Sequence, residues 1–382
     1  MLHKIGGRFA LKKRLLCSLI LIFVFVTCIA FSKERQLNLN CIAATIIDQD
    51  SGRILYSKNG NKILPMASTT KIMTAIVALE RGNIKDIVTI SKKAASTPGS
   101  SAGLKAGDKV TLEELLYGLM LKSGNDAAVA IAEHIGGNVQ NFVRMMNDKA
   151  VELGALHTSF ITPHGLDADD HFTTANDLAR ITAYAMKNEM FAKIVSTKEI
   201  SSGITGPFKY SYNNINKFLF RVENSDGVKT GYTGNAGKCL VASVKHKFGR
   251  FICVILNSSD RWEDAENLVQ YALKKYNFIK VFDKTEIVKS IPVYGGNQKN
   301  IYAQTKSELY IPILPEEKDK IKVEVYVPSV VFAPISKGEI VGNIVVKLDG
   351  SIIAKYPVVS DREVKRKNFL DFIKDVFSRA VF

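Results

Sequence analysis

The stretch LPMASTTKIMTA, residues 64–75, places Ser68 three positions before Lys71. On a helix, side chains three positions apart lie on the same face, so the amine of this lysine could take the proton of the hydroxyl and make the serine a nucleophile. Serine and threonine are also common at helix N-termini, where their oxygens accept backbone N–H groups. The pair is the only Ser-x-x-Lys in the chain, and alone it fits either an ordinary helix start or a nucleophile beside its base.

Two further polar motifs follow in the chain: Ser123-Gly124-Asn125 and Lys229-Thr230-Gly231. Ser-x-x-Lys, Ser-Asp-Asn and Lys-Thr-Gly together are typical of active-site serine enzymes that react with penicillin. In this chain the middle motif has glycine in place of aspartate. Alone, Ser-Gly-Asn would be read as a tight turn between helices, and the order of the three motifs is what gives it a chemical meaning.

The stretches around these motifs carry a family resemblance: ASTTKIMTA, LLYGLMLKSGNDAA, HGLD, FTTANDLA and GVKTGYTGNAG. Over about residues 40–280 the chain resembles the D-alanyl-D-alanine carboxypeptidases, the low-molecular-weight penicillin-binding proteins of peptidase family S11. The resemblance implies a serine-type D-Ala-D-Ala carboxypeptidase that removes the terminal D-alanine from peptidoglycan stem pentapeptides through an acyl-enzyme on Ser68. It also implies β-lactam antibiotics as covalent inhibitors, and we expect no metal or organic cofactor.

The residue types suit this chemistry. A lysine acts as a base only when it is neutral, and burial together with a second cation, Lys229, would lower the pKa of Lys71. We expect the backbone N–H of Ser68 to form an oxyanion hole with a second N–H from the strand after the third motif. The resemblance assigns this second donor to Tyr232.

The remaining site residues are assigned by resemblance. Ser123 would help to relay the proton to the leaving amine, and Asn125 would orient the substrate amide. The expected substrate-binding residues around the third motif are Lys229, Thr230, Gly231, Tyr232, Thr233 and Arg261. A cation and hydroxyl donors are the groups that a terminal carboxylate needs, although Arg261 fits a solvated turn residue equally well.

Three alternatives remain open at this point. A β-lactamase or an endopeptidase could use the same scaffold, but no Glu-x-x-Leu-Asn follows the helical unit to activate a deacylating water, so fast lactam hydrolysis is not expected. The third alternative is a catalytically idle wall-binding protein. The lysine next to Ser68 argues against it, because an idle protein has no need of that amine.

The N-terminus predicts export. A basic start, an apolar run over 15–31 and a polar stretch after it are typical of a secretory signal peptide over residues 1–30, and an uncleaved membrane anchor is the alternative. The net charge of +15 favours an anionic partner. Because the protein is exported, we expect no nucleic acid as a partner, and we place the protein at the outer face of the cytoplasmic membrane or in the cell wall.

A sheet and several helices must bring the motifs together. After the expected signal peptide, strand patterns occur at 41–59 and again at 227–259. Helical patterns lie between these two regions, and a further helical pattern follows at 263–278. We expect an α+β fold whose β-lactamase/transpeptidase-like catalytic domain covers 38–282, with an antiparallel sheet built from both ends of this segment, helices on both faces and a helical insertion. Cys41, Cys239 and Cys253 lie in apolar, strand-like runs and are expected to be buried, although one disulfide among them also fits.

Two smaller units are predicted after the catalytic domain. An all-β pattern over 284–360 predicts a small β-sandwich domain. The last segment, 363–382, places apolar residues on one helical face and basic residues around it. This pattern predicts an amphipathic helix that binds an anionic membrane surface, and a helix packed on the β domain is the alternative.

Overall fold

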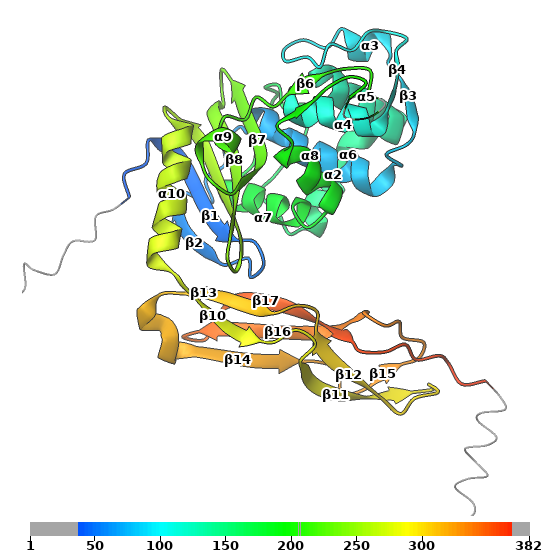
Figure 1. The fold of residues 1–382 in the computed structure, drawn as a ribbon, viewed down its shortest axis with the longest axis vertical. Coiled ribbons are helices and arrows are strands. Elements are labelled where there is room, and N and C mark those ends of the chain that lie inside the picture. Colours follow the sequence, from blue (N-terminus) through cyan, green and yellow to red (C-terminus); the bar gives the residue numbers. More distant parts are fainter. Residues whose placement is uncertain (1–36, 205, 207, 369–382) are drawn as a thin grey trace, which may run out of the picture. The chain divides into compact units, whose positions relative to one another are not determined.

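The computed structural model describes residues 37–204, 206 and 208–368 (Figure 1). Within these residues, no helix has the length and apolar character needed to cross a bilayer. The expected signal peptide over 1–30 lies outside the described residues.

The catalytic domain contains a five-stranded antiparallel sheet with the strand order β2-β1-β9-β8-β7. Its strands are β1 (Cys41–Asp48), β2 (Ile54–Lys58), β7 (Ser225–Thr233), β8 (Gly237–His246) and β9 (Gly249–Ser258). The sheet therefore joins the beginning of this domain to its end, with α10 after β9 and the other helices inserted between β2 and β7. The predicted α+β class and the sheet built from both ends are confirmed.

Helices cover the sheet on both sides (Figure 1). α10 (Arg261–Lys275) packs against β1, β8 and β9, and α7 (Ala175–Ala185) and α8 (Glu189–Ser196) pack against β1, β7 and β9. The inserted part also contains the helices α2 (Lys71–Arg81), α3 (Lys92–Ala95), α4 (Leu112–Leu121), α5 (Asn125–Gly136), α6 (Val139–Glu152) and α9 (Phe218–Arg221). Two short strand pairs complete it. β3 (Ile87–Thr89) pairs with β4 (Lys109–Thr111), and β5 (Glu199–Ile200) pairs with β6 (Tyr212–Asn213).

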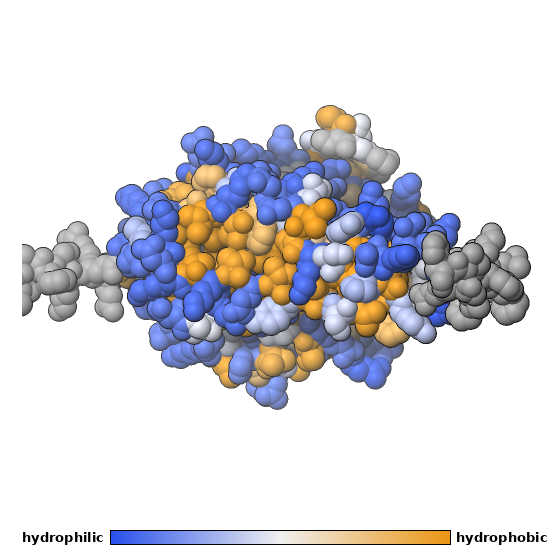
Figure 2. Space-filling view, turned by 90° about the horizontal axis from the view of Figure 1, so that it is seen from below, coloured by the Kyte–Doolittle hydropathy of each residue, from blue (hydrophilic) through white to orange (hydrophobic). Residues whose placement is uncertain are grey.

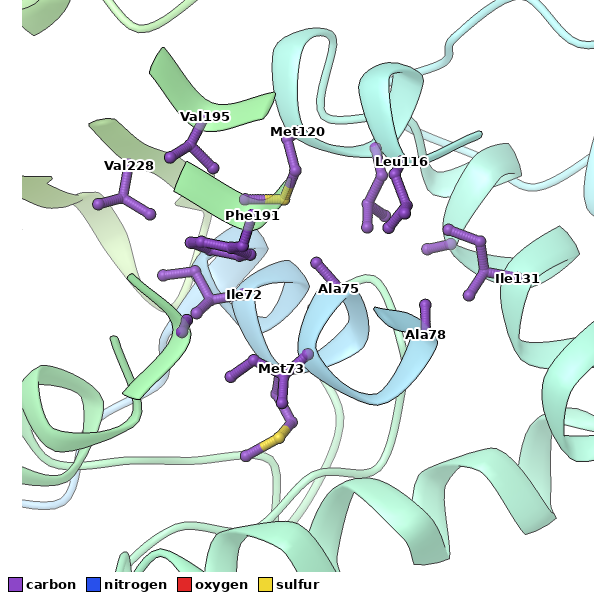
Figure 3. Close-up of a cluster of buried hydrophobic side chains, with 14 of the residues drawn as sticks. Ile72, Met73, Ala75, Ala78, Leu116, Met120, Ile131, Phe191, Val195 and Val228 are labelled. Atoms are coloured by element: carbon purple, nitrogen blue, oxygen red, sulfur yellow. The ribbon is translucent and has the colours of Figure 1, made fainter. Parts of the chain in front are cut away.

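Helix α2 lies at the centre of the catalytic core (Figure 3). Every residue from Lys71 to Ala78 is buried, so this helix has no solvent face over its first two turns. Ile72 points toward Phe191 of α8, whereas Met73 points to the other side of the helix (Figure 3), and both belong to the apolar core. Burial of each large side chain contributes roughly 1.5–3 kcal/mol. The helix that carries the Ser-x-x-Lys motif is therefore held rigidly from all sides.

The β domain consists of two sheets. A six-stranded sheet has the order β14-β16-β17-β12-β11-β15, and β10 pairs with β13 in a second sheet. The strands are β10 (Asn277–Phe282), β11 (Ile287–Tyr294), β12 (Asn300–Thr305), β13 (Leu309–Ile313), β14 (Ile321–Tyr326), β15 (Val331–Phe332), β16 (Ile340–Leu348) and β17 (Ser351–Ser360). The boundary expected at 282–284 falls earlier, between α10 and β10, because β10 finds its hydrogen-bond partners in β13.

The β domain exposes apolar side chains on its surface. Figure 2, which looks at this domain from below the view of Figure 1, shows hydrophobic residues gathered in the middle of one face with hydrophilic residues around them. Its exposed large hydrophobic side chains include those of Ile287, Tyr294, Phe332, Ile340 and Ile352. Its core is apolar and contains Ile291, Ile301, Ile311, Ile344 and Val358.

Two sequence-based expectations need correction or completion. Residues 363–368 are not helical: Val364 is buried and pairs with Ile335, and Arg366 pairs with Gly296, so this segment extends the β domain. The rest of the expected amphipathic helix, 369–382, lies outside the described residues. Cys41, Cys239 and Cys253 are buried and free, so the disulfide alternative is wrong for these three.

Candidate active site

Ser68 lies in a turn of 3-10 helix, Ala67–Thr70, directly before α2. The two threonines after it stabilise this turn: Thr69 Oγ1 donates to Met66 O at 2.6 Å, and Thr70 Oγ1 donates to Ala67 O at 2.8 Å. No side chain caps the N-terminus of α2. The interpretation of Ser68 as an ordinary helix cap is therefore wrong, because its hydroxyl is engaged elsewhere.

The hydroxyl of Ser68 contacts the amine of Lys71. Lys71 Nζ is 2.9 Å from Ser68 Oγ, 2.7 Å from Asn125 Oδ1 and 2.6 Å from the carbonyl oxygen of His164. A neutral amine has two N–H donors and one lone pair. If the donors serve the two shorter contacts, to Asn125 and His164, the lone pair is left for the proton of Ser68.

The surroundings favour the neutral form of Lys71. Its side chain is fully buried, and burial lowers its pKa well below the ordinary value, with a further lowering by the positive charge of Lys229 and an opposing effect of Asp126. Burial disfavours the charged form because the protein interior solvates an ammonium group poorly. The lowered pKa therefore favours an amine that can accept the proton of Ser68.

Asn125 is held so that its oxygen points at the lysine. Its Nδ2 donates to Pro98 O at 2.6 Å, and its backbone N–H donates to Ser100 O at 2.7 Å. Gly99, with φ 92°, passes so close that a Cβ there would lie 2.7 Å from Asn125 Nδ2, so only glycine fits. Ser123 is buried, with φ 62°, and is held in the left-handed region two residues before Asn125.

The third motif lies on strand β7, at the edge of the sheet, against the turn that carries Ser68. A Cβ on Gly231 would be 3.1 Å from Ser68 N and 3.0 Å from Ala67 Cβ, so the backbones pack almost directly on each other. Lys229 is buried, and its Nζ donates to Thr230 O at 2.9 Å. Burial, with a smaller effect of Arg261, lowers the pKa of Lys229 to about 7.

Arg261 is fixed beneath this strand. Its Nη1 donates to Gly231 O at 2.7 Å and to Cys239 O at 3.0 Å, and its guanidinium lies 4.7 Å from the ring centroid of Trp262. The solvated-turn alternative for Arg261 is therefore wrong. The guanidinium holds the ends of β7 and β8 together beside the site.

The comparisons with known proteins agree with this geometry. The family described as D-alanyl-D-alanine carboxypeptidase matches residues 30–260, and the C-terminal domain of penicillin-binding protein 5 matches residues 276–366. The D-alanyl-D-alanine carboxypeptidase DacF of Bacillus subtilis is 35% identical, and the alignment covers 95% of this chain and 97% of DacF. The chain belongs to the D-alanyl-D-alanine carboxypeptidase family.

Other relatives and solved structures lead to the same family. DacC of Escherichia coli is 31% identical over 91% of this chain and 90% of its own length. The crystal structure of penicillin binding protein 5 from Haemophilus influenzae is 30% identical, with a TM-score of 0.66 over 86% of this chain and 98% of that one. A mutant of the Streptomyces K15 DD-transpeptidase is 33% identical, with a TM-score of 0.59 over 62% of this chain and 99% of that one.

The predicted function is therefore confirmed at the level of the family. The protein is a serine hydrolase, a D-alanyl-D-alanine carboxypeptidase of the penicillin-binding type. This interpretation is supported over the three alternatives, a β-lactamase, an endopeptidase and an idle wall-binding protein.

Sequence reasoning missed three side chains that build the site of this carboxypeptidase. The first is Asp126, which is buried and accepts hydrogen bonds from Ser101 Oγ at 2.6 Å and from the backbone N–H groups of Ala102 at 2.8 Å and Gly103 at 3.0 Å. It therefore holds the loop whose carbonyls orient Asn125. An acidic residue in the first turn of a helix was the available signal, but it did not reveal the partner loop.

The second is His171. Its Nδ1 accepts the backbone N–H of Ile161 at 2.9 Å, so Nε2 carries the proton and faces Thr70 Oγ1 at 2.8 Å. Burial lowers the pKa of His171 to about 4, and the ring is neutral at neutral pH. The imidazole therefore ties the loop of residues 161–171 to the turn of Ser68.

The third is Asp167. Its Oδ1 accepts the hydroxyl of Thr233 at 2.6 Å, and its Oδ2 accepts the backbone N–H of Asn235 at 3.3 Å. The hydroxyl of Thr233, which sequence analysis assigned to the substrate carboxylate, thus donates to the carboxylate of Asp167 instead. Tyr232, between Thr233 and Gly231, has an exposed side chain.

Proposed function

We propose that the protein removes the terminal D-alanine from peptidoglycan stem pentapeptides through an acyl-enzyme on Ser68. The observation that carries this proposal is the distance of 2.9 Å between Ser68 Oγ and the fully buried amine of Lys71. A serine hydroxyl becomes a good nucleophile only when a positioned base takes its proton. β-Lactam antibiotics would acylate the same oxygen and stay bound as covalent inhibitors.

The proposed reaction has two halves. Ser68 Oγ attacks the carbonyl carbon between the two D-alanines while Lys71 Nζ takes the hydroxyl proton. The backbone N–H groups of Ser68 and Tyr232 stabilise the negative oxygen that forms. Ser123 helps to pass a proton to the leaving amine, and the C–N bond breaks. Water then attacks the ester and releases the shortened stem and free Ser68.

The substrate would lie along β7. We assign Asn125 to the substrate amide and the residues around the third motif to the terminal carboxylate: Lys229, Thr230, Gly231, Thr233 and Arg261. The buried cation Lys229 supports this assignment, because a carboxylate stabilises the charged form of a lysine that burial disfavours. Arg261 would act through Gly231, whose carbonyl it holds, as well as by its charge.

Mass spectrometry of the products from a soluble pentapeptide tests the proposal. We expect the mass of one D-alanine to be lost, with no cleavage elsewhere in the stem. The Ser68→Ala variant should neither release D-alanine nor acquire the mass of a penicilloyl group, because both reactions use the same oxygen. A Ser68→Ala variant that still becomes labelled would show that another residue is the nucleophile.

The location of the enzyme is part of the proposal. We infer that it works at the outer face of the cytoplasmic membrane or in the wall, and that residues 369–382 attach it to anionic lipid. A truncation that tests this attachment should end at Asn368, because deletion from residue 363 would also remove the buried Val364. With the leader absent, the truncated enzyme should remain in the supernatant of anionic vesicles that sediment the longer form. Equal sedimentation of both forms would disprove attachment through residues 369–382.

A further inference from the structure

Two aromatic side chains project from one edge of the six-stranded sheet of the β domain. Tyr294 ends β11 and Phe332 ends β15, and these two strands pair in parallel. The ring centroids are 5.8 Å apart, and 70% of Tyr294 and 68% of Phe332 is exposed. They border a hollow of about 360 Å³. Because neither ring packs into the core, the fold itself gains little from them.

The surface around these rings is positively charged. Lys299 in the β11–β12 turn is exposed, as are Lys365 and Arg366 in the last described segment. The segments that form this edge, 287–305, 329–338 and 364–368, contain lysine and arginine but no aspartate or glutamate. Glu286, Glu339 and Glu363 come only at their borders. Exposed aromatic rings among unopposed cations are the combination that suits the interface of an anionic bilayer.

The C-terminal segment is fastened to the same edge. Arg366 pairs with Gly296, and the backbone N–H of Lys367 donates to Gly295 O at 2.9 Å. Figure 1 shows the last described residues, in red, beside β15 and the β11–β12 hairpin. Asn368, the last described residue, lines the same hollow as Tyr294 and Phe332, so the described chain ends at the edge that carries the two rings.

We propose that this edge, which we call the aromatic tip (Tyr294, Phe332, Lys299, Lys365 and Arg366), contacts the surface of an anionic lipid bilayer. The two rings lie at the level of the headgroups, and the cations contact the lipid phosphates. The tip is a second membrane contact, made by the folded β domain itself. This inference goes beyond the proposed function and does not depend on the catalytic assignments.

The opposite edge of the same sheet provides a matched control. Tyr326 on β14 is also exposed, at 51%. It lies among opposite charges, because Glu324 accepts hydrogen bonds from both the Tyr326 hydroxyl and Lys347 Nζ. A ring with these partners has no net positive surroundings, and it should stay away from the lipid.

Fluorescence quenching by lipid tests the proposal in the full chain. Trp262 is the only tryptophan, so a Trp262→Phe background allows a single reporter to be introduced, Phe332→Trp at the tip or Tyr326→Trp at the opposite edge. The proteins are reconstituted into anionic phosphatidylglycerol vesicles with and without brominated acyl chains. We expect the emission of the Phe332→Trp variant to fall about twofold or more in brominated vesicles, because tryptophan settles at the membrane interface. The Tyr326→Trp emission should stay unchanged.

Charge reversal separates lipid binding from other contacts. Lys299→Glu, Lys365→Glu and Arg366→Glu together should remove most of the quenching of the tip reporter, whereas the matched reversal at Lys318, Lys320 and Lys322 should not. If the tip variant has a lowered melting temperature, Tyr294→Trp in the unreversed chain serves as an independent reporter with the same expected quenching. Equal quenching by brominated lipid of the reporters at both edges would overturn the proposal. A blue shift at the tip without quenching by bromine would also overturn it, because the ring would then be covered by protein.

Discussion

The two domains differ in what they bury. In the described residues of the β domain, from 277 to 368, the buried polar side chains are Thr305 and Ser360. The catalytic domain buries two lysines of the candidate site, Lys71 and Lys229, as well as Asp126 and other charged side chains. Burial of a charged group costs free energy unless hydrogen bonds and partners offset it. The catalytic domain thus bears a free-energy cost of buried charge that the described part of the β domain does not bear.

This contrast follows the division of tasks. The buried amine of Lys71 lies beside the hydroxyl whose proton we propose that it takes, and the buried carboxylate of Asp126 holds a loop by hydrogen bonds. The β domain has an apolar core and places its unusual side chains outside, at Tyr294 and Phe332. The buried charges of the candidate site thus lie where we propose the chemistry, and the exposed rings lie where we propose a contact with lipid.

The largest expected effect tests whether the buried amine is a base. Lys71→Arg keeps a cation in place, but a guanidinium stays protonated and cannot take the proton of Ser68. Acylation by penicillin should fall by several orders of magnitude, as measured by the rate at which the penicilloyl mass appears. Lys149→Arg, at another buried lysine, which pairs with Glu80, should keep its rate. A Lys71→Arg variant with normal acylation would remove Lys71 from this role.

A matched pair of core substitutions separates the two domains. Ile72→Ala in α2 and Ile344→Ala in β16 each delete the same atoms from a fully buried site, and each should lower the free energy of unfolding by about 2–5 kcal/mol. Only Ile72→Ala should slow acylation, by about tenfold or more, because it loosens the helix that holds Lys71. Denaturation curves and acylation rates below the unfolding transition measure both effects. Equal slowing by the two variants would show that the β domain shapes the site.

The pH dependence tests the coupling between the two buried lysines. As the proposed base, Lys71 would work in its neutral form, so the rate should rise as the pH rises through its pKa. The pKa of Lys71 is lowered first by burial and then by the charge of Lys229. Lys229→Met removes this charge, so the pKa of Lys71 should rise, and the acidic limb of kcat/KM should move to higher pH by on the order of one unit.

The control for this shift is Lys245→Met, at an exposed lysine on β8. This variant should leave the limb where it is, since Lys245 does not affect the pKa of Lys71. A Lys229→Met variant that loses activity at every pH without moving the limb would mean that Lys229 acts only through the substrate. The rate of penicillin acylation measured against pH should show the same acidic limb, and this measurement does not include the deacylation step.

The smallest expected effect concerns Asp167 at the end of β7. Asp167→Asn keeps an oxygen acceptor for the Thr233 hydroxyl but removes the negative charge from the place where we expect the substrate carboxylate. KM for the pentapeptide should fall by about threefold with kcat unchanged, a modest change because the pair is exposed. Asp169→Asn, two residues away in the same exposed loop, should leave KM unchanged. A higher KM for Asp167→Asn would show that Asp167 assists binding.

Much of this protein follows from sequence alone. Three short motifs in order identified the family, because the reaction that we propose for Ser68, Lys71 and Lys229 admits few substitutes. Strand patterns before and after the helical segment gave a sheet built from both ends, which the structure confirms. Such features are local or depend on residue type, so they can be read from the order of the residues.

Other features were decided only by the tertiary structure. Four hydrogen bonds of the site depend on how distant segments pack. Asp126 binds the loop of residues 98–104, and the N–H of Ile161 sets the tautomer of His171. Asp167 binds Thr233, and Arg261 binds the carbonyl of Gly231. The strand β10 and the segment 363–368 likewise took their conformation from partners elsewhere in the β domain. A sequence pattern reports which face of an element is apolar, but the partner that covers a given polar atom depends on how distant segments pack.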